Sequence, residues 1–294
     1  MSMERATETD IIIRPLAGLH EMQAAEKLQQ EVWGIGELET VSAAEMIAVQ
    51  HAGGTVIGAF TGVELIGFVY GFPGYENGRV TIHSHLAAVK PAWRNYQTGA
   101  RLKQAQRADA LARGISEITW TYDPLQSLNA HFNFAKLGVT TSHYKVNFYG
   151  AEMTILVPGI GTDRFWVSWQ LDSERVRRKS AGLPAQPDPA EELSTAEKLV
   201  ELMPGNVPRL NAEVKLTNAA EAPSLLIDIP AEIAAVQRES NELAIAWRET
   251  TRQAFTSAFA AGYTALEFFH QKQHQPPRGS YLLCPSARAE HYRR

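Results

Sequence analysis

The sequence predicts an α/β protein built on a mixed β-sheet. Over roughly the first 170 residues, short runs rich in β-branched and aromatic residues alternate with amphipathic stretches of helical spacing. Turn signals join the strands between positions 55 and 89, which favours an antiparallel meander, and helices alternate with strands after it. With 294 residues, 45% of them hydrophobic, the chain has room for one large domain or two smaller ones.

A strand, two helices and an antiparallel meander make up the first part of this prediction. The β-branched run at 11–15 is followed by a helix whose apolar residues recur three and four positions apart. The next helix begins with Ser42 and Glu45 in capping-box spacing. The expected elements are a strand over 11–15, helices over 20–33 and 42–51, and strands over 55–60, 64–72 and 79–89.

Helices and strands alternate beyond the meander. Gly114 is placed to end the first of these helices, and Gly138 ends the second in the same way. The expected elements are helices over 99–114 and 125–137 and strands over 115–122, 141–148 and 165–171.

The composition changes after residue 172. Repeated prolines interrupt any long element there, and the basic run 175–179 is typical of a solvated linker, although it could also lie beside a phosphate group. We predict a core domain over 1–172, a proline-rich linker over 173–223 with one helix at 194–202, and a C-terminal αβ extension over 224–294 packed on the core. The extension is expected to hold strands over 224–229, 263–269 and 281–284 and a long helix over 242–261.

Charge and cysteine usage exclude several classes of protein. Cys284 is the single cysteine, so there is no intrachain disulfide or cysteine-rich metal site, and a buried apolar role is its simplest interpretation. The net charge of −4 gives no general attraction to nucleic acid. No apolar run is long enough to span a bilayer, and residues 1–10 lack the features of a secretory signal. We therefore expect a cytoplasmic protein that binds neither nucleic acid nor membrane.

The segment 81–99 carries the most informative pattern. A strand ends at Val89, a short loop follows, and a helix begins at Gly99. Such a connection presents backbone N–H groups at the positive end of the helix dipole, where phosphates bind. An ordinary strand-to-helix connection has the same pattern, and the glycine spacing of a Walker loop or dinucleotide fingerprint is absent.

This segment resembles motif A of the GNAT acyltransferases, in the form Val-x-Pro-x-aromatic-Arg-x-x-x-x-Gly. Arg94 and Gly99 match the ends of the family's Arg/Gln-x-x-Gly-x-Gly/Ala core, whereas Gln97 stands where its first glycine is expected. The run 135–139, Ala-Lys-Leu-Gly-Val, is similar to the end of motif B. Segments 83–85, 119–125, 129–131 and 163–165 together resemble a subfamily of predicted GNAT proteins with a C-terminal extension.

The resemblance implies a GNAT-like fold with acetyl-CoA or another acyl-CoA as co-substrate and no metal. In that family the loop amides hold the coenzyme's pyrophosphate, and amides at the strand end pair with the pantetheine arm and polarise the thioester carbonyl. Gln97 could crowd the pyrophosphate, bond to it or weaken coenzyme affinity. The residues that the resemblance places at the coenzyme are Leu86, Ala87, Val89, Arg94, Gln97, Thr98, Gly99, Ala100 and Asn129.

His83 occupies the strand position at which many GNAT relatives carry a catalytic glutamate. An imidazole can take a proton from an amine directly or through water, and His85, on the same face, could share the role. Both histidines could instead be strand residues satisfied by their neighbours. Phe134 stands where relatives often have a tyrosine as general acid, so Tyr144 or Tyr149 is the candidate substitute, although tyrosines near strands more often pack.

The sequence thus predicts an N-acyltransferase, in its simplest form an acetyltransferase, that transfers an acyl group from coenzyme A to the amine of a small molecule or amino-acid-like acceptor. Gln97 and Phe134 also leave open a degenerate GNAT fold that serves as a ligand-binding or assembly module. The helix over 242–261 could pack the extension, cover a sheet edge, line the substrate site or pair with a second subunit in a homodimer.

Overall fold

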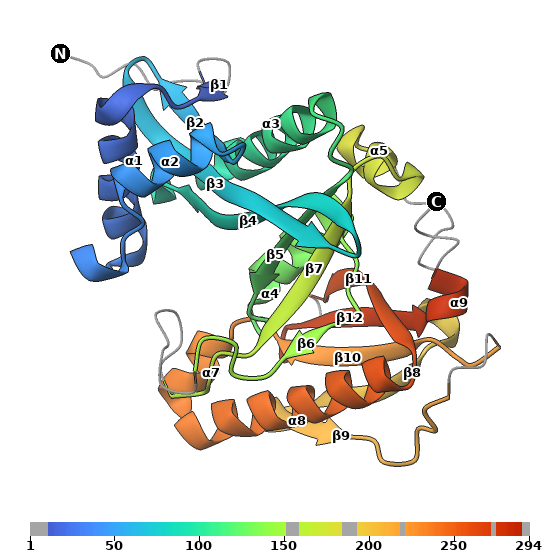
Figure 1. The fold of residues 1–294 in the computed structure, drawn as a ribbon. Coiled ribbons are helices and arrows are strands. Elements are labelled where there is room, and N and C mark those ends of the chain that lie inside the picture. Colours follow the sequence, from blue (N-terminus) through green and yellow to red (C-terminus); the bar gives the residue numbers. More distant parts are fainter. Residues whose placement is uncertain (1–10, 151–158, 184–192, 218–220, 272–274, 290–294) are drawn as a thin grey trace. The chain divides into compact units, whose positions relative to one another are not determined.

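The computed structural model describes residues 11–150, 159–183, 193–217, 221–271 and 275–289. Helices and strands alternate along the chain (Figure 1), and the sheets contain both parallel and antiparallel pairs, so the predicted mixed α/β class is confirmed. Tertiary contacts divide the chain into two compact units, Met1–Trp120 and Thr121–Arg294. The division falls within one strand, and each unit is described separately below.

The first unit is a sheet with the strand order β1-β2-β3-β4-β5. Its first four strands pair antiparallel in succession, and β5 pairs parallel to β4. Its elements are β1 (Ile11–Pro15), α1 (Gly18–Trp33), the 3-10 turn η2 (Glu37–Glu39), α2 (Ala43–His51), β2 (Thr55–Thr61), β3 (Glu64–Glu76), β4 (Arg79–Val89), the 3-10 turn η3 (Pro91–Tyr96), α3 (Thr98–Ala112) and β5 (Glu117–Tyr122).

Apolar clusters cover both faces of this sheet. On one face, Met22 of α1 and Met46 of α2 pack against Phe68 of β3. On the other, Leu102 of α3 packs against Ile57 and residues of β1 and β3. The sheet is therefore buried on both sides, which holds β4 rigidly between its neighbours.

Local signals set the ends of several elements in this unit. The Ser42 hydroxyl caps α2 by accepting a hydrogen bond from the Glu45 N–H, as the sequence predicts. At the β3–β4 hairpin, Asn77 and Gly78 both adopt positive φ, the backbone of a tight two-residue turn. Because the turn is confined to these two residues, β3 continues to Glu76 and does not end at residue 72 as predicted.

The second unit contains a five-stranded sheet with the order β11-β12-β10-β8-β9, in which β8 and β10 are parallel and the other neighbours antiparallel. A short antiparallel pair, β6 and β7, precedes it. Its elements are α4 (Ser127–Ala130), the π-helical turn η4 (His131–Leu137), β6 (Tyr144–Lys145), β7 (Arg164–Gln170), α5 (Glu174–Ser180), β8 (Glu197–Met203), the 3-10 turn η5 (Pro204–Asn206), β9 (Val207–Leu210), β10 (Leu225–Pro230), α7 (Ile233–Glu239), α8 (Asn241–Ala260), β11 (Tyr263–Gln271), β12 (Arg278–Pro285) and α9 (Ser286–Ala289).

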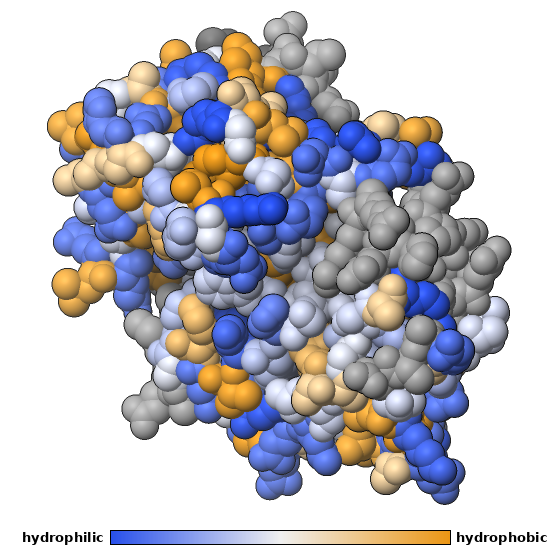
Figure 2. Space-filling view, turned by 45° about the vertical axis from the view of Figure 1, so that its right-hand side comes forward, coloured by the Kyte–Doolittle hydropathy of each residue, from blue (hydrophilic) through white to orange (hydrophobic). Residues whose placement is uncertain are grey.

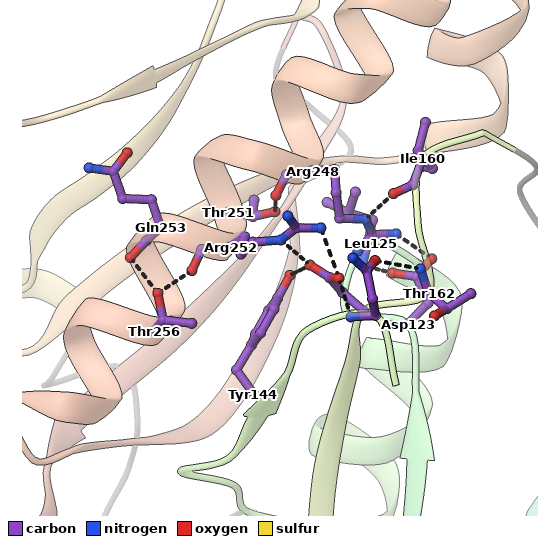
Figure 3. A network of polar contacts seen from close by, with 12 residues as sticks. Asp123, Leu125, Tyr144, Ile160, Thr162, Arg248, Thr251, Arg252, Gln253 and Thr256 are labelled. Carbon is purple, nitrogen blue, oxygen red and sulfur yellow. Dashed lines mark hydrogen bonds and ion pairs between the residues drawn. The ribbon is translucent and has the colours of Figure 1, made fainter. Parts of the chain in front are cut away.

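Buried ion pairs and hydrogen bonds tie α8 to the segment between β5 and β7 (Figure 3). Arg248 donates to the Asp123 carboxylate at 2.8 Å, and Arg252 donates twice to Asp163, at 2.8 and 3.0 Å. The Tyr144 hydroxyl donates to the same carboxylate at 2.7 Å. These contacts join residues 121–172 to the C-terminal part of the chain.

The division by contacts falls after Trp120, whereas the sequence places a domain boundary after residue 172. The boundary after residue 172 remains a prediction. Long-range contacts such as Thr141 with Ala265 and Tyr122 with Tyr281 place 121–172 in the same unit as the C-terminal sheet. Linker composition gives no information on such contacts, because they join residues more than a hundred positions apart.

Three local predictions are wrong, and in a fourth the helix is present but has a different type over part of its length. Residues 197–203 form strand β8 and not a helix, because β8 pairs with β10 on one side and β9 on the other. The strand expected over 141–148 is reduced to the two residues of β6. The helix expected over 125–137 is present over residues 127–137, as α4 followed by the π-helical η4, and it ends at Gly138 as predicted. The basic run is helix α5 and not a solvated linker, since Arg175 is buried beside Glu267.

The surface is chemically mixed. On the face shown in Figure 2, hydrophilic residues are interspersed with separate apolar areas. Within the described ranges, no helix is long and apolar enough to cross a membrane. Cys284 is buried, as predicted, with its sulfur 3.2 Å from the Ser224 hydroxyl.

Candidate active site

The candidate active site lies in the first unit, on β4 and the loop that follows it. In the register of β4 with β3, Tyr70 faces Leu86 and the next residue, Gly71, faces Ser84, so His85 is the extra residue of a β-bulge. His83 and His85 then lie on the same side of the strand, with ring centroids 6.4 Å apart. The two predicted catalytic histidines therefore share one face, as their two-residue spacing predicts.

Beyond the bulge, one edge of β4 diverges from its parallel neighbour. The β4–β5 register comprises Ile82 with Ile118 and His83 with Thr119. On the other edge, β4 remains paired to β3 as far as Val89. The backbone of Leu86, Ala87 and Val89 on the β5 side is therefore outside the pairing between these two strands, where an extended ligand can add hydrogen bonds.

The loop after β4 keeps a glycine-like backbone without the glycine. Gln97 has φ 56° and ψ 14°, which is the left-handed region. This conformation costs a non-glycine residue about 1 kcal/mol or more. The position at which the family resemblance expects glycine thus retains the corresponding backbone turn, and the departure in sequence does not extend to the main chain.

Helix α3 begins directly after this turn. Its first internal bond runs from the Arg101 N–H to the Gln97 carbonyl at 3.0 Å, so the amides of Thr98, Gly99 and Ala100 precede the helical ladder. No described side chain caps this helix start. The Thr98 hydroxyl is instead turned back to the Trp93 carbonyl at 2.9 Å. These three amides form a candidate anion-binding end.

Arg94 is bonded to the end of β4. Its Nε donates to the Val89 carbonyl at 3.2 Å, and its side chain is exposed. In the same loop, the rings of Trp93 and Tyr96 are in tilted contact with centroids 5.3 Å apart. Arg94 thus stiffens the junction between β4 and the loop and leaves its terminal guanidinium nitrogens near the surface.

His83 belongs to a row of polar residues across three strands. Its side chain is 8% exposed, and Nδ1 lies 3.1 Å from the Thr119 hydroxyl on β5. That hydroxyl in turn donates to the Glu76 carboxylate on β3 at 3.2 Å. Burial, followed by the proximity of His85 and Lys103, lowers the pKa of His83 to about 4. His83 is therefore neutral at pH 7.

His85 is more exposed than His83 and lies among aromatic rings. Its centroid is 5.7 Å from that of Phe72 and 6.3 Å from that of Tyr70. Partial desolvation lowers the pKa of His85, and the nearby Glu45 carboxylate opposes this shift. Glu45, on α2, accepts a hydrogen bond from the Tyr70 hydroxyl at 3.1 Å. Burial, followed by this carboxylate, raises the pKa of Tyr70, which keeps its hydroxyl protonated.

A buried lysine lies on the opposite face of β4. Lys103 of α3 is 4% exposed. Its Nζ donates to the Ser84 hydroxyl at 2.9 Å and to the side-chain amide oxygen of Gln106, Oε1, at 2.8 Å. It also lies 3.9 Å from the centroid of the Trp120 ring. Desolvation lowers the pKa of Lys103 to about 7. This places a weakly basic amine directly behind the histidine pair.

Two predicted site residues belong to the second unit. Asn129 is exposed on α4. Tyr144 stacks on Phe255 with centroids 5.9 Å apart and donates its hydroxyl proton to Asp163. Burial raises the pKa of Tyr144 well above its usual value, so its surroundings are those of a structural hydroxyl.

The sequence analysis missed Glu76, Thr119, Glu45 and Lys103. The alternation of β5 could have indicated Thr119, because it separates this residue from the buried Ile118 and Trp120. Glu76 was hidden by the turn-rich sequence after Phe72, and the link between Glu45 and Tyr70 depends on the packing of α2. In the part of the chain that the structure describes, no group of three or more His, Cys, Asp or Glu residues could hold a metal.

Comparison with known proteins gives partial structural matches. No family model and no curated protein matches the sequence. A putative GNAT acetyltransferase from Desulfovibrio desulfuricans is similar over 55% of this chain and 99% of its own, at 14% identity and a TM-score of 0.44. A GNAT acetyltransferase from Elizabethkingia anophelis, solved with acetyl-CoA bound, matches over 55% of this chain and 98% of its own, at 18% identity and 0.43.

The ribosomal-protein-S18-alanine N-acetyltransferase from Escherichia coli matches over 55% of this chain and 94% of its own, at 13% identity and a TM-score of 0.43. Each of these three matches covers about half of this chain.

Proposed function

We propose that this protein is an acyl-CoA-dependent N-acyltransferase with its reaction centre on β4 of the first unit. One observation carries the proposal: the edge of β4 diverges from its parallel neighbour, and the chain then passes through η3 into a left-handed turn at Gln97 and the start of α3. An extended thioester-bearing arm can pair with the free edge of β4, and a pyrophosphate can bind at the turn and the start of α3. His83 and His85 lie where these features begin.

The chemistry requires a held thioester, a polarised carbonyl and removal of one proton from the amine. In this proposal the amine nitrogen attacks the thioester carbon, and the carbon–sulfur bond breaks as the amide forms. His83 accepts the amine proton, and the coenzyme thiolate leaves and is protonated from solvent. Its neutral state at pH 7 leaves the imidazole able to accept that proton. Tyr144 is not given a role as acid, since its proton is donated to Asp163.

The charges around the histidines favour a cationic acceptor. Glu45 lies near His85, and Glu76 is joined to His83 through Thr119. Two carboxylates beside a pair of neutral imidazoles attract an ammonium group and not an acid. The acceptor proposed is therefore a small or amino-acid-like amine that binds in its ammonium form. It loses one proton to solvent before it attacks the thioester, and His83 accepts the second as the amide forms.

Binding is tested by thermal melting with acetyl-CoA and with free coenzyme A. Millimolar ligand should raise the melting temperature by mass action. Ala100→Asp should abolish this rise, because a carboxylate at the start of α3 repels phosphate while suiting the helix dipole. Ala100→Asn, which has the same shape without the charge, is the matched control and should still respond. An unchanged melting temperature in the wild-type protein would contradict coenzyme binding.

Turnover is tested by free-thiol release from acetyl-CoA with a panel of amines. His83→Ala should lower kcat about 100-fold or more and leave the coenzyme-induced melting shift intact. His51→Ala, at an exposed histidine in the last turn of α2, is the control and should keep full activity. Coenzyme binding without thiol release for any amine would identify a non-catalytic binding module instead.

A further inference from the structure

Two hydrogen bonds link Glu76, Thr119 and His83 in a row. Their donor–acceptor directions determine which nitrogen of the histidine carries the proton. A threonine hydroxyl has one proton to donate. The Thr119 hydroxyl donates it to Glu76 Oε1 at 3.2 Å. The 3.1 Å contact between the same oxygen and His83 Nδ1 must then have the nitrogen as donor. Nδ1 consequently carries the imidazole proton, and Nε2 carries the lone pair.

We propose that Glu76 and Thr119 are positioning residues that hold His83 in the Nδ1–H tautomer, so that Nε2 is the atom that accepts the proton of the acceptor amine. The inference rests on the proposed acyl transfer for its catalytic meaning, whereas the tautomer itself is a property of the free protein. In the transfer step, the N–H bond of the amine breaks and an Nε2–H bond forms, giving an imidazolium whose Nδ1–H still faces Thr119.

The strand register explains why these residues meet. Phe72, His83 and Thr119 are direct cross-strand neighbours on β3, β4 and β5. Glu76 lies at the end of β3, four residues beyond Phe72 and on the same face, from where its side chain reaches Thr119. Thr119 is 1% exposed, so water does not compete readily for its hydroxyl. The hydrogen-bond direction is thus set by a partly buried carboxylate acting on a buried hydroxyl.

The arrangement also predicts how it can be reversed. An ionised carboxylate only accepts hydrogen bonds, so Glu76 requires Thr119 to be the donor. In Glu76→Gln, the amide NH2 can donate to the Thr119 oxygen and release the hydroxyl proton toward His83 Nδ1. The imidazole proton would then move to Nε2, which would lose its lone pair. Glu76→Gln should therefore invert the tautomer without removing a side chain.

The primary test is ¹⁵N NMR of protein labelled at histidine, with His83 assigned by the loss of its signals in His83→Ala. At pH 7, the wild-type protein should show a protonated Nδ1 and an unprotonated Nε2 at His83. Glu76→Gln should shift the population toward Nε2–H, and Thr119→Val should give a mixture of both forms. Thr119→Ser, which keeps the hydroxyl, should restore the wild-type spectrum.

Two control substitutions account for general effects on the strands. Thr81→Val changes a buried threonine of β4 that is 1% exposed and whose hydroxyl has no hydrogen-bond partner. Glu64→Gln changes the glutamate at the other end of β3, which pairs with Lys90. Neither should alter the tautomer of His83. A wild-type Nε2–H form, or a tautomer unaffected by both Glu76→Gln and Thr119→Val, would overturn the proposal.

The kinetic arm connects the tautomer to catalysis. If the protein transfers acyl groups, Glu76→Gln and Thr119→Val should each lower kcat about 10- to 100-fold with little change in KM for acyl-CoA, and Thr119→Ser should recover the rate. Full kcat in variants whose tautomer has inverted would overturn the catalytic part. If no amine supports turnover, the proposed function fails, while the NMR result still decides the hydrogen-bond direction.

Discussion

The two units bury polar groups in opposite ways. In the second unit, carboxylates meet guanidinium groups: Asp123 with Arg248, and Asp163 with Arg252. Burial opposes charge on Arg248, but Asp123 outweighs it and raises the pKa of the guanidinium. In the first unit, the buried His83 contacts the Thr119 hydroxyl, and the buried Lys103 donates to the Ser84 hydroxyl and the Gln106 side-chain amide. Desolvation lowers both pKa values.

This difference separates structural polar groups from chemically available ones. A matched ion pair keeps its charges at every physiological pH and loses stability when one partner is removed. A desolvated histidine or lysine is neutral or nearly so, and its lone pair can accept a proton. The contrast points to the first unit for proton transfer and to the second for holding the chain together.

The largest effect is expected from breaking the Asp123–Arg248 pair. Asp123→Ala leaves a guanidinium that is 2% exposed without its carboxylate, and should lower the free energy of unfolding by about 3–5 kcal/mol. Asp109→Ala breaks an exposed helical pair with Arg113 and should cost less than about 1 kcal/mol. Urea denaturation measures both. Equal losses in the two variants would contradict the distinction between buried and exposed pairs.

A smaller effect is expected from acid. The folded-state pKa of His83 lies at about 4, below the unfolded value of about 6.5, so the unfolded chain binds the proton first. The stabilising contribution is therefore present above pH 6.5 and is lost as the pH falls toward 4. His83→Gln should reduce the loss of unfolding free energy between pH 7 and 5 by about 2 kcal/mol relative to wild type. An unchanged pH dependence would show that His83 titrates normally.

Replacing Lys103 should have a still smaller effect. Lys103→Met removes a desolvated amine, which favours folding. It also leaves the Ser84 and Gln106 acceptors without their donor, which opposes folding. The free energy of unfolding at pH 7 should change by less than about 1 kcal/mol. Arg248→Met leaves the buried Asp123 carboxylate without its ion-pair partner. This contrasting variant should lose several times more unfolding free energy. Calorimetry or urea denaturation compares them, and a large loss in Lys103→Met would indicate a charged lysine.

The smallest change is expected at the loop turn. Gln97→Gly removes the cost of about 1 kcal/mol for a non-glycine residue in the left-handed region. Glycine, however, loses more conformational entropy on folding. The net change in unfolding free energy should lie within about 0.5 kcal/mol, and coenzyme binding should be retained. Gln97→Val should be less stable than either, since β-branched residues suit this region poorly. A stable valine variant would show that the turn adapts.

Local sequence patterns predicted most of the first unit. The capping residues of α2 and the glycine that follows α3 fixed helix positions, because such signals act within a few residues. Prediction failed where the partners are distant. Residues 197–203 have apolar spacing that fits either a helix or a strand, and pairing with β10 and β9 decides for the strand. The π-helical turn at 131–137 gave no local signal.

The sequence by itself determined that a strand with two histidines runs into a loop and a helix start, because residue type and spacing are sufficient for that pattern. Tertiary structure alone decided the bulge at His85, the divergence of β5 from β4 and the row that joins Glu76, Thr119 and His83. These features depend on the register between strands. Register arises from the packing of both sheet faces, and no single segment encodes it.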